Sequence, residues 1–379
     1  MNTPAAFRPI SADSHVTEPR NCYIDYIDPA FRARAPRIVR EQDGGDSFAI
    51  DGMPGTVPVS IISAAGLDPR KITMSGRKIE EIHPGGYDPR ARLADQDRDG
   101  VAAEIIYPSV GMVLCNHPEP AYKNACFQAY NRWLQEFCAA APGRLFGMGQ
   151  TAVTSVAEAI EDLRRIKEMG FAGVMMPGEP CTEQDYYDPI FDPLWKAAVE
   201  LGLPLSFHIL TSRRGNTKTL NGVHAEDVSR GVLGTHGAIR PNQDIIGNFI
   251  WGRVFERHPD LRIVCVEADA GWAPHFMYRM DHAYKRLRYM LRIGDMARLP
   301  SEYFHDNVYL TFQDDWVAFR MLDMCNPRRL LWANDFPHSD STWPGSQELL
   351  AEHTAGMGER EKRWILADNV TELYRLNVH

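Results

Sequence analysis

Short apolar segments alternate with amphipathic helical stretches along most of the chain, and this alternation constrains the fold more than any other feature. The predicted strands span 7–15, 100–110, 144–153, 171–177, 203–209, 261–268, 307–312 and 328–335. The predicted helices span 121–139, 155–170, 190–202, 243–257, 273–291 and 346–356. Repeated strand–helix units imply a parallel sheet. Eight strands favour a distorted (β/α)8 barrel of the TIM type over an open doubly wound sheet, and no G-x-G-x-x-G motif follows the first strand.

The chain is predicted to form a single α/β domain, residues 1–379, with two long insertions. Residues 16–90 follow the first strand, contain a hairpin-like piece at 46–60, and are expected to cover the barrel mouth. Residues 212–240 form a second long loop after the fifth strand. Long loops on the C-terminal side of barrel strands usually carry function. Residues 358–379 are expected to form a C-terminal helical segment.

Charge and cysteine content exclude several classes of function. The chain is 44% apolar and 24% charged, has a net charge of −9, and scatters its Lys and Arg residues. We therefore expect no nucleic-acid partner and no binding to anionic lipid. No apolar run approaches about 18 residues, so no membrane span or secretion signal is expected. Seven cysteines without a C-x-x-C motif indicate neither a disulfide framework nor a zinc ribbon, which favours the reducing cytoplasm.

Candidate metal ligands gather at the predicted C-terminal ends of four strands. Asp13 and His15 end the first strand, His208 the fifth, Glu267 the sixth and Asp335 the eighth. In a barrel these ends converge on one face, and residues i and i+2 of a strand point the same way. The two imidazoles with Asp13 and Asp335 form a donor set that suits one divalent transition metal. Each residue alone has a structural alternative: His208 as a hydrogen-bonded core residue, Asp13 as a turn residue, and Asp335 as a helix cap.

Five longer motifs resemble the amidohydrolase superfamily, specifically its amidohydrolase-2 branch, which contains aminocarboxymuconate-semialdehyde decarboxylase-like and resorcylate decarboxylase-like enzymes. The motifs are "ADSHVTEP" (12–19), "LSFHI" (205–209), "EADAGWAPHFMYRMD" (267–281), "WANDFPHSDSTWP" (332–344) and "ILADNVTELYRL" (365–376). The resemblance covers nearly the whole chain, and the 332–344 block is its most specific part. It implies a metal held by Asp13, His15, His208 and Asp335, with Asp335 also handling a proton.

The chain departs from this family pattern at one catalytic position. Many decarboxylases of the branch have a histidine at the end of the sixth strand, where this sequence has Glu267. A neutral imidazole can donate to a carboxylate or shuttle a proton, whereas an ionised glutamate repels a carboxylate unless burial raises its pKa. His275, eight residues further on, could replace the imidazole or lie exposed on a helix. His338 could orient Asp335 or reach the substrate, or it could cap a helix. Asp335, His275, Glu267 and His338 are the candidate catalytic residues.

Substrate contacts are predicted less directly. Tyr107, Trp272 and Trp343 flank the strand ends, where aromatic rings suit a planar substrate or pack the barrel rim. An arginine that binds the substrate carboxylate is expected in a decarboxylase. Arg213, Arg214 and Arg240 are candidates, but a solvated surface position is the favoured interpretation of each. Arg92 and Arg98 lie in a charged helix and are predicted to face solvent.

These features favour a metal-dependent enzyme acting on a small molecule. The resemblance implies a non-oxidative decarboxylase, a carbon–carbon lyase acting on a small aromatic or unsaturated carboxylate. Glu267 in place of histidine favours the alternative, a hydrolase that uses metal-activated water on an ester, lactone, C–N or C–C bond. A metal-free binding barrel is a third hypothesis. One divalent ion is expected, zinc first, with manganese, iron and magnesium as alternatives, in a homo-oligomer (dimer or tetramer).

Overall fold

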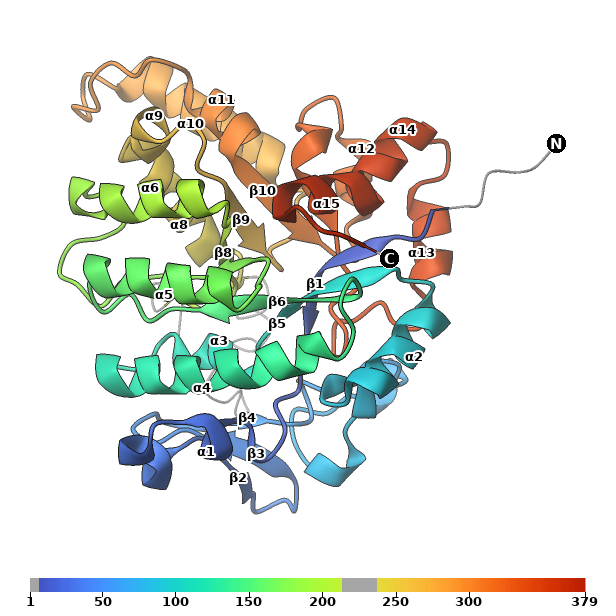
Figure 1. Ribbon diagram of the computed structural model, residues 1–379. Coiled ribbons are helices and arrows are strands. Elements are labelled where there is room, and N and C mark those ends of the chain that lie inside the picture. The colour runs from blue at the N-terminus through green and yellow to red at the C-terminus, as the bar shows by residue number, and fades with distance from the viewer. Residues whose placement is uncertain (1–6, 213–236, 379) are drawn as a thin grey trace.

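The computed structural model, which describes residues 7–212 and 237–378, forms an eight-stranded parallel barrel surrounded by helices (Figure 1). The strands run in chain order around the barrel: β1 Ile10–His15, β5 Ala103–Tyr107, β6 Leu145–Gln150, β7 Gly173–Met175, β8 Leu205–His208, β9 Ile263–Val266, β10 Val308–Phe312 and β11 Leu330–Trp332. Hydrogen bonds just beyond β11 close the circle. The Asp335 N–H donates to the Asp13 carbonyl at 3.1 Å, and the His15 N–H donates to the Phe336 carbonyl at 2.7 Å. All eight predicted strands are confirmed.

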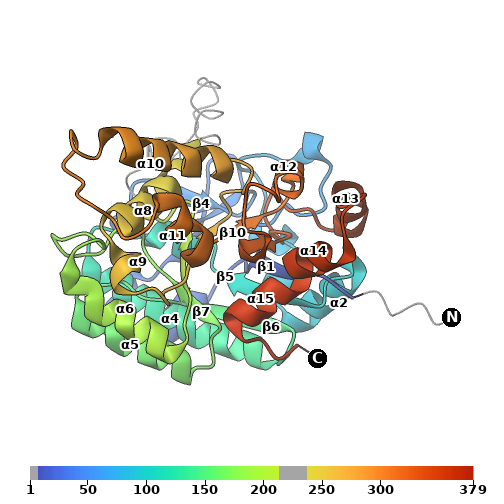
Figure 2. The ribbon, with the colours of Figure 1, turned by 90° about the horizontal axis from the view of Figure 1, so that it is seen from above.

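Helices follow the strands and surround the barrel (Figures 1 and 2). Their bounds are α1 Cys22–Tyr26, α2 Pro89–Asp99, α3 Val110–Leu114, α4 Pro120–Ala139, α5 Val156–Glu168, α6 Asp192–Leu201, α8 Arg240–Trp251, α9 Val254–Arg257, α10 Ala273–Leu287, α11 Pro300–Asn307, α12 Trp316–Arg320, α13 Ser346–His353, α14 Glu359–Arg363 and α15 Asn369–Tyr374. Short 3-10 turns span Pro29–Arg34, Pro69–Lys71, Ile79–Glu81, Pro84–Gly86, Pro189–Phe191 and Pro327–Arg329, and a π-helical turn spans Trp364–Asp368. None of the helices in the described ranges is long and apolar enough to cross a membrane.

Local sequence explains where these helices begin and end. The Ser155 hydroxyl accepts the N–H of Glu158 and so caps α5, and Gly170 adopts the left-handed conformation just beyond it. The single helix predicted over 243–257 is instead two helices, because Arg253 has a φ of 57° and interrupts the helical path between α8 and α9. The helix predicted over 273–291 ends at Leu287.

The segment 16–90 carries a small antiparallel sheet of its own. Strands β2 Arg37–Arg40, β3 Asp46–Ala49 and β4 Thr56–Pro58 form it, so the predicted hairpin within 46–60 is present. Beyond β4, the Ser339 N–H donates to the Ile61 carbonyl at 3.0 Å, and the Ala65 N–H donates to the Pro337 carbonyl at 3.0 Å. These bonds attach the segment to the loop that follows β11.

Residues 359–374 are helical, and residues 375–378 follow them without regular structure. Helix α15 lies close to β1 in both ribbon views (Figures 1 and 2). The side chain of Asn369 donates to the carbonyls of Pro327 and Leu330 at 2.7 and 2.8 Å, which fixes the start of α15 against β11.

The prediction for Arg92 is wrong. Arg98 is exposed as expected, but the Arg92 side chain on the same helix, α2, has no exposed surface. The buried face of α2 consists of Arg92, Gln96 and Asp99, polar residues at the spacing of successive helical turns. Glu104 on β5 lies opposite and accepts a hydrogen bond from the Arg92 Nε at 2.5 Å. A helix that buries polar groups against a carboxylate lacks the apolar stripe by which buried faces are recognised.

Candidate metal centre

Five acidic and imidazole side chains meet at the C-terminal ends of the barrel strands. The His15 Nε2 lies 3.3 Å from Asp13 Oδ1, 3.2 Å from His208 Nε2 and 3.4 Å from Asp335 Oδ1. The His208 Nε2 lies 3.2 Å from Glu267 Oε2. Asp13, His15, His208 and Asp335 are fully buried, and Glu267 retains 14% side-chain exposure. The structure therefore brings together the four residues predicted as ligands and adds Glu267 to them.

Irregular backbone geometry orients three of these side chains, those of Asp13, Glu267 and Asp335. A bulge in β1 between Ser11 and Ser14 interrupts the pairing with β5, and Asp13 lies inside it. Bulges of this kind redirect side chains and are common beside active sites. Glu267 and Asp335 have φ values of 57° and 51°, a left-handed conformation that non-glycine residues rarely adopt. Such strain is typical of functional positions.

Hydrogen bonds fix the tautomers of the two histidines. The Nδ1 of His15 lies 2.9 Å from the Pro108 carbonyl, and the Nδ1 of His208 lies 3.1 Å from the Ile209 carbonyl. A carbonyl only accepts, so each Nδ1 carries a proton, and in the neutral ring that a metal requires each Nε2 presents a lone pair. The two Nε2 atoms face each other at 3.2 Å. Donor atoms of one tetrahedral ion, each about 2.0–2.1 Å from it, are separated by about 3.3 Å.

The carboxylates of the cluster lack hydrogen-bond donors. Both Oδ atoms of Asp13, both Oδ atoms of Asp335 and the Oε2 of Glu267 are buried without a hydrogen-bond partner. Buried polar atoms nearly always have a partner, because leaving a carboxylate without one is costly. A divalent cation would satisfy all of these oxygens and both Nε2 lone pairs. The donor set therefore fits a metal ion.

The pKa directions follow from burial and crowding of like charges. Burial and the charge of Asp13 raise the pKa of Asp335 well above its usual value. Burial and the charge of Asp335 do the same to the pKa of Glu267. Burial, together with nearby His338, lowers the pKa of His15 to about 3. The imidazole of His15 is therefore neutral, as a ligand must be, and a bound cation would favour the ionised carboxylates.

His338 lies directly behind the cluster. Its ring stacks on that of His15 with centroids 3.8 Å apart, and its Nε2 lies 2.7 Å from the Ser109 Oγ. That hydroxyl donates its single proton to the Val16 carbonyl at 2.6 Å, so it accepts the Nε2–H of His338. The Nδ1 of His338 thus presents a lone pair to Asp335 Oδ1 at 3.2 Å. Without a bound ion, two acceptors at this distance would share a proton. Burial lowers the pKa of His338 to about 3 and raises the pKa of Asp335, which favours Asp335 as the residue that holds the proton in the metal-free protein.

His275 is not part of this arrangement. It lies on the exposed face of α10, and its ring contact is Tyr278, with centroids 6.1 Å apart. Many decarboxylases of the branch have a histidine at the end of the sixth barrel strand, which is β9 here. Of the two residues considered for its role, Glu267 lies in the cluster and His275 does not. The structure therefore argues against a catalytic role for His275.

Ser109 and Glu18 are functional candidates that sequence reasoning missed. Glu18 is fully buried and accepts the N–H groups of Ser109, Val110 and Gly111 at 3.2, 2.9 and 3.3 Å. Burial raises the pKa of Glu18 to about 7, against the lowering effect of these hydrogen bonds. Glu18 thereby holds the loop after β5 that carries Ser109. Ser109 lies two residues beyond the end of β5. A search of strand C-terminal ends, which located the proposed ligands, could therefore also have found Ser109.

The three aromatic residues considered as substrate contacts, Tyr107, Trp272 and Trp343, all contact other parts of the protein. Tyr107 is fully buried, and its hydroxyl lies 2.9 Å from the Ser206 Oγ. Trp343 is buried against Phe336, with ring centroids 5.3 Å apart. The indole N–H of Trp272 donates to the Ala268 carbonyl at 2.7 Å. Each of these contacts agrees with the structural alternative.

Of the three arginine candidates, Arg240 lies in the described part of the chain, where it is exposed at the start of α8. Arg213 and Arg214 lie outside the described residues, as does most of the predicted loop 212–240.

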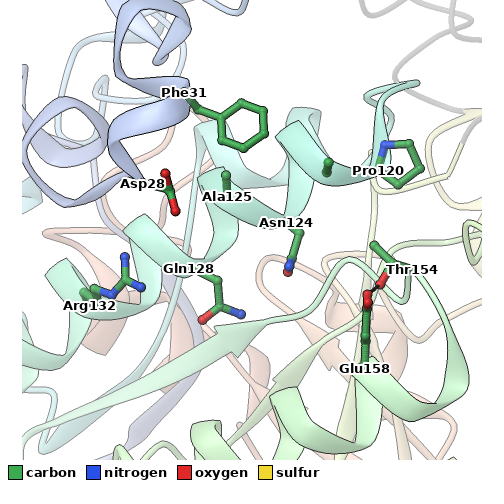
Figure 3. Close-up of a pocket in the computed structure, with 10 residues that line it drawn as sticks. Asp28, Phe31, Pro120, Asn124, Ala125, Gln128, Arg132, Thr154 and Glu158 are labelled. Atoms are coloured by element: carbon green, nitrogen blue, oxygen red, sulfur yellow. Dashed lines mark hydrogen bonds between the residues drawn. The ribbon is translucent and has the colours of Figure 1, made fainter.

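A surface hollow of about 480 Å³ lies elsewhere, between the 3-10 turn Pro29–Arg34, helix α4 and the start of α5 (Figure 3). Its walls include Phe31, Asn124, Gln128 and Glu158. None of the clustered acidic or imidazole residues lines it, so the hollow is separate from the metal centre.

The match to a family model decides the affiliation. Residues 74–376, more than half of the chain, match the model described as Amidohydrolase. The chain belongs to the amidohydrolase family. The resemblance inferred from the motifs is confirmed, and with it the expectation of a metal-dependent enzyme. Family membership and the donor geometry together support a divalent metal ion in this amidohydrolase.

Individual relatives are distant but cover most of the chain. The 2-amino-3-carboxymuconate-6-semialdehyde decarboxylase of Dictyostelium discoideum is 22% identical over 81% of this chain and 82% of its own length. An amidohydrolase structure from Mycobacterium avium subsp. paratuberculosis K-10 has a TM-score of 0.77, with 20% identity over 98% of this chain and 100% of that chain. The 5-carboxyvanillate decarboxylase of Novosphingobium aromaticivorans DSM 12444, in complex with manganese and 4-hydroxy-3-methoxy-5-nitrobenzoic acid, has a TM-score of 0.66, with 19% identity over 98% and 97% of the two chains. The structural matches confirm the barrel fold.

Proposed function

We propose that this amidohydrolase is a metal-dependent, non-oxidative decarboxylase of a small aromatic or unsaturated carboxylate. The observation that carries the proposal is the buried cluster in which two imidazole lone pairs and several carboxylate oxygens without hydrogen-bond partners converge. Asp13, His15, His208 and Asp335 would hold the ion. The choice of reaction is supported by relatives whose names describe decarboxylases of unsaturated and aromatic carboxylates.

Proton delivery is the step that the protein itself must supply. A divalent ion bound here supplies Lewis-acid polarisation of substrate oxygen atoms. As the bond to the carboxylate carbon breaks and CO2 leaves, the ring or alkene carbon must gain one proton. Asp335, whose Oδ1 lies 3.2 Å from the Nδ1 of His338, would carry that proton once substrate displaced its carboxylate from the ion. Ser109 keeps His338 in the tautomer that leaves this Nδ1 free to accept.

Glu267 is compatible with a carboxylate substrate because its pKa is raised. Burial favours the neutral form of Glu267, which can donate a hydrogen bond instead of repelling an anion. The alternative reaction, hydrolysis, rests on the same residue, since an ionised Glu267 could act as general base toward water. The two reactions are distinguished by product, because only decarboxylation releases CO2.

The ion we propose is zinc, with manganese as the alternative. Two imidazoles and two aspartates suit zinc, and additional carboxylate oxygens such as that of Glu267 shift the donor set toward manganese. The carboxyvanillate decarboxylase named above was crystallised with manganese.

Further parts of the proposal concern the surroundings of the site. Segment 16–90 would shape the pocket, because residues 61–65 are hydrogen-bonded to the loop that carries His338. We also propose a homo-oligomer, dimer or tetramer, in the cytoplasm, where seven free cysteines would stay reduced.

A substrate screen tests the reaction. Metal-loaded protein would be incubated with hydroxybenzoates, other aromatic carboxylates, esters, lactones and amides, and CO2 release and acid release would be followed separately. We expect CO2 from at least one aromatic or unsaturated carboxylate, and a rate lower by about 10²–10⁴ with Asp335→Asn. Turnover of esters, lactones or amides without CO2 release would establish the hydrolase instead.

A further inference from the structure

Arg92 lies fully buried at the seam where the barrel closes, and it contacts the backbone of two strand ends that carry proposed ligands. Its Nη1 donates to the His15 carbonyl at 2.7 Å, and its Nη2 donates to the Phe336 carbonyl at 3.3 Å. His15 is a proposed ligand, and Phe336 directly follows the proposed ligand Asp335. The guanidinium of Arg92 is therefore hydrogen-bonded both to the end of β1 and to the segment that follows β11, next to the proposed ligands His15 and Asp335.

The remaining contacts of Arg92 hold the guanidinium in one orientation. Its Nε donates to Glu104 Oε2 at 2.5 Å, and its Nη1 also donates to the Gly85 carbonyl at 3.1 Å. The guanidinium carbon lies 4.5 Å from the centre of the Phe336 ring. Glu104 is itself held by Gln96, whose Nε2 donates to it at 2.6 Å. The carboxylate, the ring and three carbonyls together leave the guanidinium plane little freedom to turn.

We propose that Arg92 is a positioning residue of the metal centre. By bridging the two carbonyls it fixes the ends of β1 and β11 relative to each other, and so fixes the separation of His15 Nε2 and Asp335 Oδ1, which is 3.4 Å. The inference rests on the metal centre proposed above. Residues that orient metal ligands from behind typically change metal affinity by about 10–100-fold when they are altered.

The planar fork of arginine is what this role requires. A guanidinium directs several N–H groups in fixed directions toward a carboxylate and separate carbonyls at once. A lysine ammonium keeps the charge opposite Glu104 but carries its donors on a single atom, so it cannot span the His15 and Phe336 carbonyls in the same way. Buried ion pairs are also weak evidence for a purely stabilising role, since apolar residues of similar volume often stabilise a core as well.

The test compares Arg92→Lys with a matched control, Arg257→Lys. Arg257 also pairs with a carboxylate, through Nε contacts of 3.0 Å to Asp192, and it donates to the Gly252 and Tyr187 carbonyls at 2.8 and 3.3 Å. It lies on α9, and none of its partners belongs to the metal cluster. Full-length proteins would be stripped with a chelator, and the Kd for Zn2+ would be measured by competition with a chromophoric chelator. Circular dichroism would confirm that each variant is folded at the temperature used.

We expect Arg92→Lys to weaken zinc binding by about 10–100-fold, and Arg257→Lys to bind within about threefold of the parent although it loses a comparable number of hydrogen bonds. Arg92→Lys binding within threefold of the parent would refute the role of Arg92 and leave the metal centre intact. A parent that binds no zinc would overturn both. If Arg92→Lys does not fold, the double variant Arg92→Met, Glu104→Leu removes both charges of the pair, and the same thresholds apply.

Discussion

Replacing Asp335 with asparagine should move the stability of the metal-free and metal-loaded proteins in opposite directions. Asn keeps the size of the side chain and one acceptor oxygen but removes the charge. In metal-free protein the parent carries two buried Asp335 oxygens without hydrogen-bond donors, beside the charge of Asp13. The amide relieves that crowding, and its N–H group can donate to the Nδ1 of His338, which lies 3.2 Å from Asp335 Oδ1.

Where Asp335 is ionised in metal-free protein, the expected gain is about 1–3 kcal/mol, the usual cost of a buried polar group without a partner. The gain depends on pH with a definite sign. The raised pKa of Asp335 means that the parent has its full stability below the unfolded value of about 3.9 and loses it as the pH rises through the folded value. The advantage of Asp335→Asn is therefore small near pH 4 and larger near pH 8. With saturating metal the variant should be the less stable protein, because a charged ligand is missing.

The assay is thermal unfolding of both proteins at several pH values, with chelator and with saturating zinc, followed by turnover at matched metal occupancy. We expect the order of the two melting temperatures to reverse on adding zinc, and turnover of the variant to fall by about 10²–10⁴. A variant that is less stable than the parent without metal would contradict the electrostatic reasoning. Activity within a few-fold of the parent would transfer the proton-carrying role to Glu267 or His338.

Three further substitutions test separate parts of the site. Ser109→Ala leaves the Nε2–H of His338 without its acceptor, so turnover should fall by about 10–100-fold with zinc still bound; an unchanged pH–rate profile and rate would refute the tautomer assignment. Glu18→Gln should flatten the pH dependence of the unfolding free energy measured in urea. The parent has its full Glu18 contribution to stability below about pH 4.3 and loses it as the pH rises through the folded-state pKa of about 7. An equal change of unfolding free energy with pH in both proteins would count against a raised pKa. His275→Ala should leave turnover within about twofold, since His275 is exposed on α10, and a larger loss would return it to the site.

The convergence of the candidate ligands could be predicted because barrel topology converts sequence position into spatial position. His15 and His208 end β1 and β8, Asp13 lies two residues before His15, and Asp335 lies three residues beyond β11. The C-terminal ends of parallel strands share one face of a barrel. No knowledge of side-chain contacts was needed to expect their convergence. Glu267 follows the same logic.

The features that the sequence did not predict depend on which face of a helix is buried and on contacts between residues far apart in the chain. Arg92 lies on a helix with no apolar stripe, and only the position of Glu104 across the interface shows that the face is internal. His275 lies near the start of α10, where a rotation of one or two residues decides between the site and solvent. The tautomer of His338 depends on the Ser109 hydroxyl, far away in sequence and held in turn by Glu18.

Anomalous diffraction tests the central claim most directly. Crystals of the full-length protein grown with zinc would be measured on either side of the zinc absorption edge. We expect one strong anomalous peak about 2.0–2.1 Å from the Nε2 atoms of His15 and His208, with oxygens of Asp13 and Asp335 at about 2.0–2.2 Å. An ion bound only at other residues, or no ion between these four side chains at saturating zinc, would contradict the account.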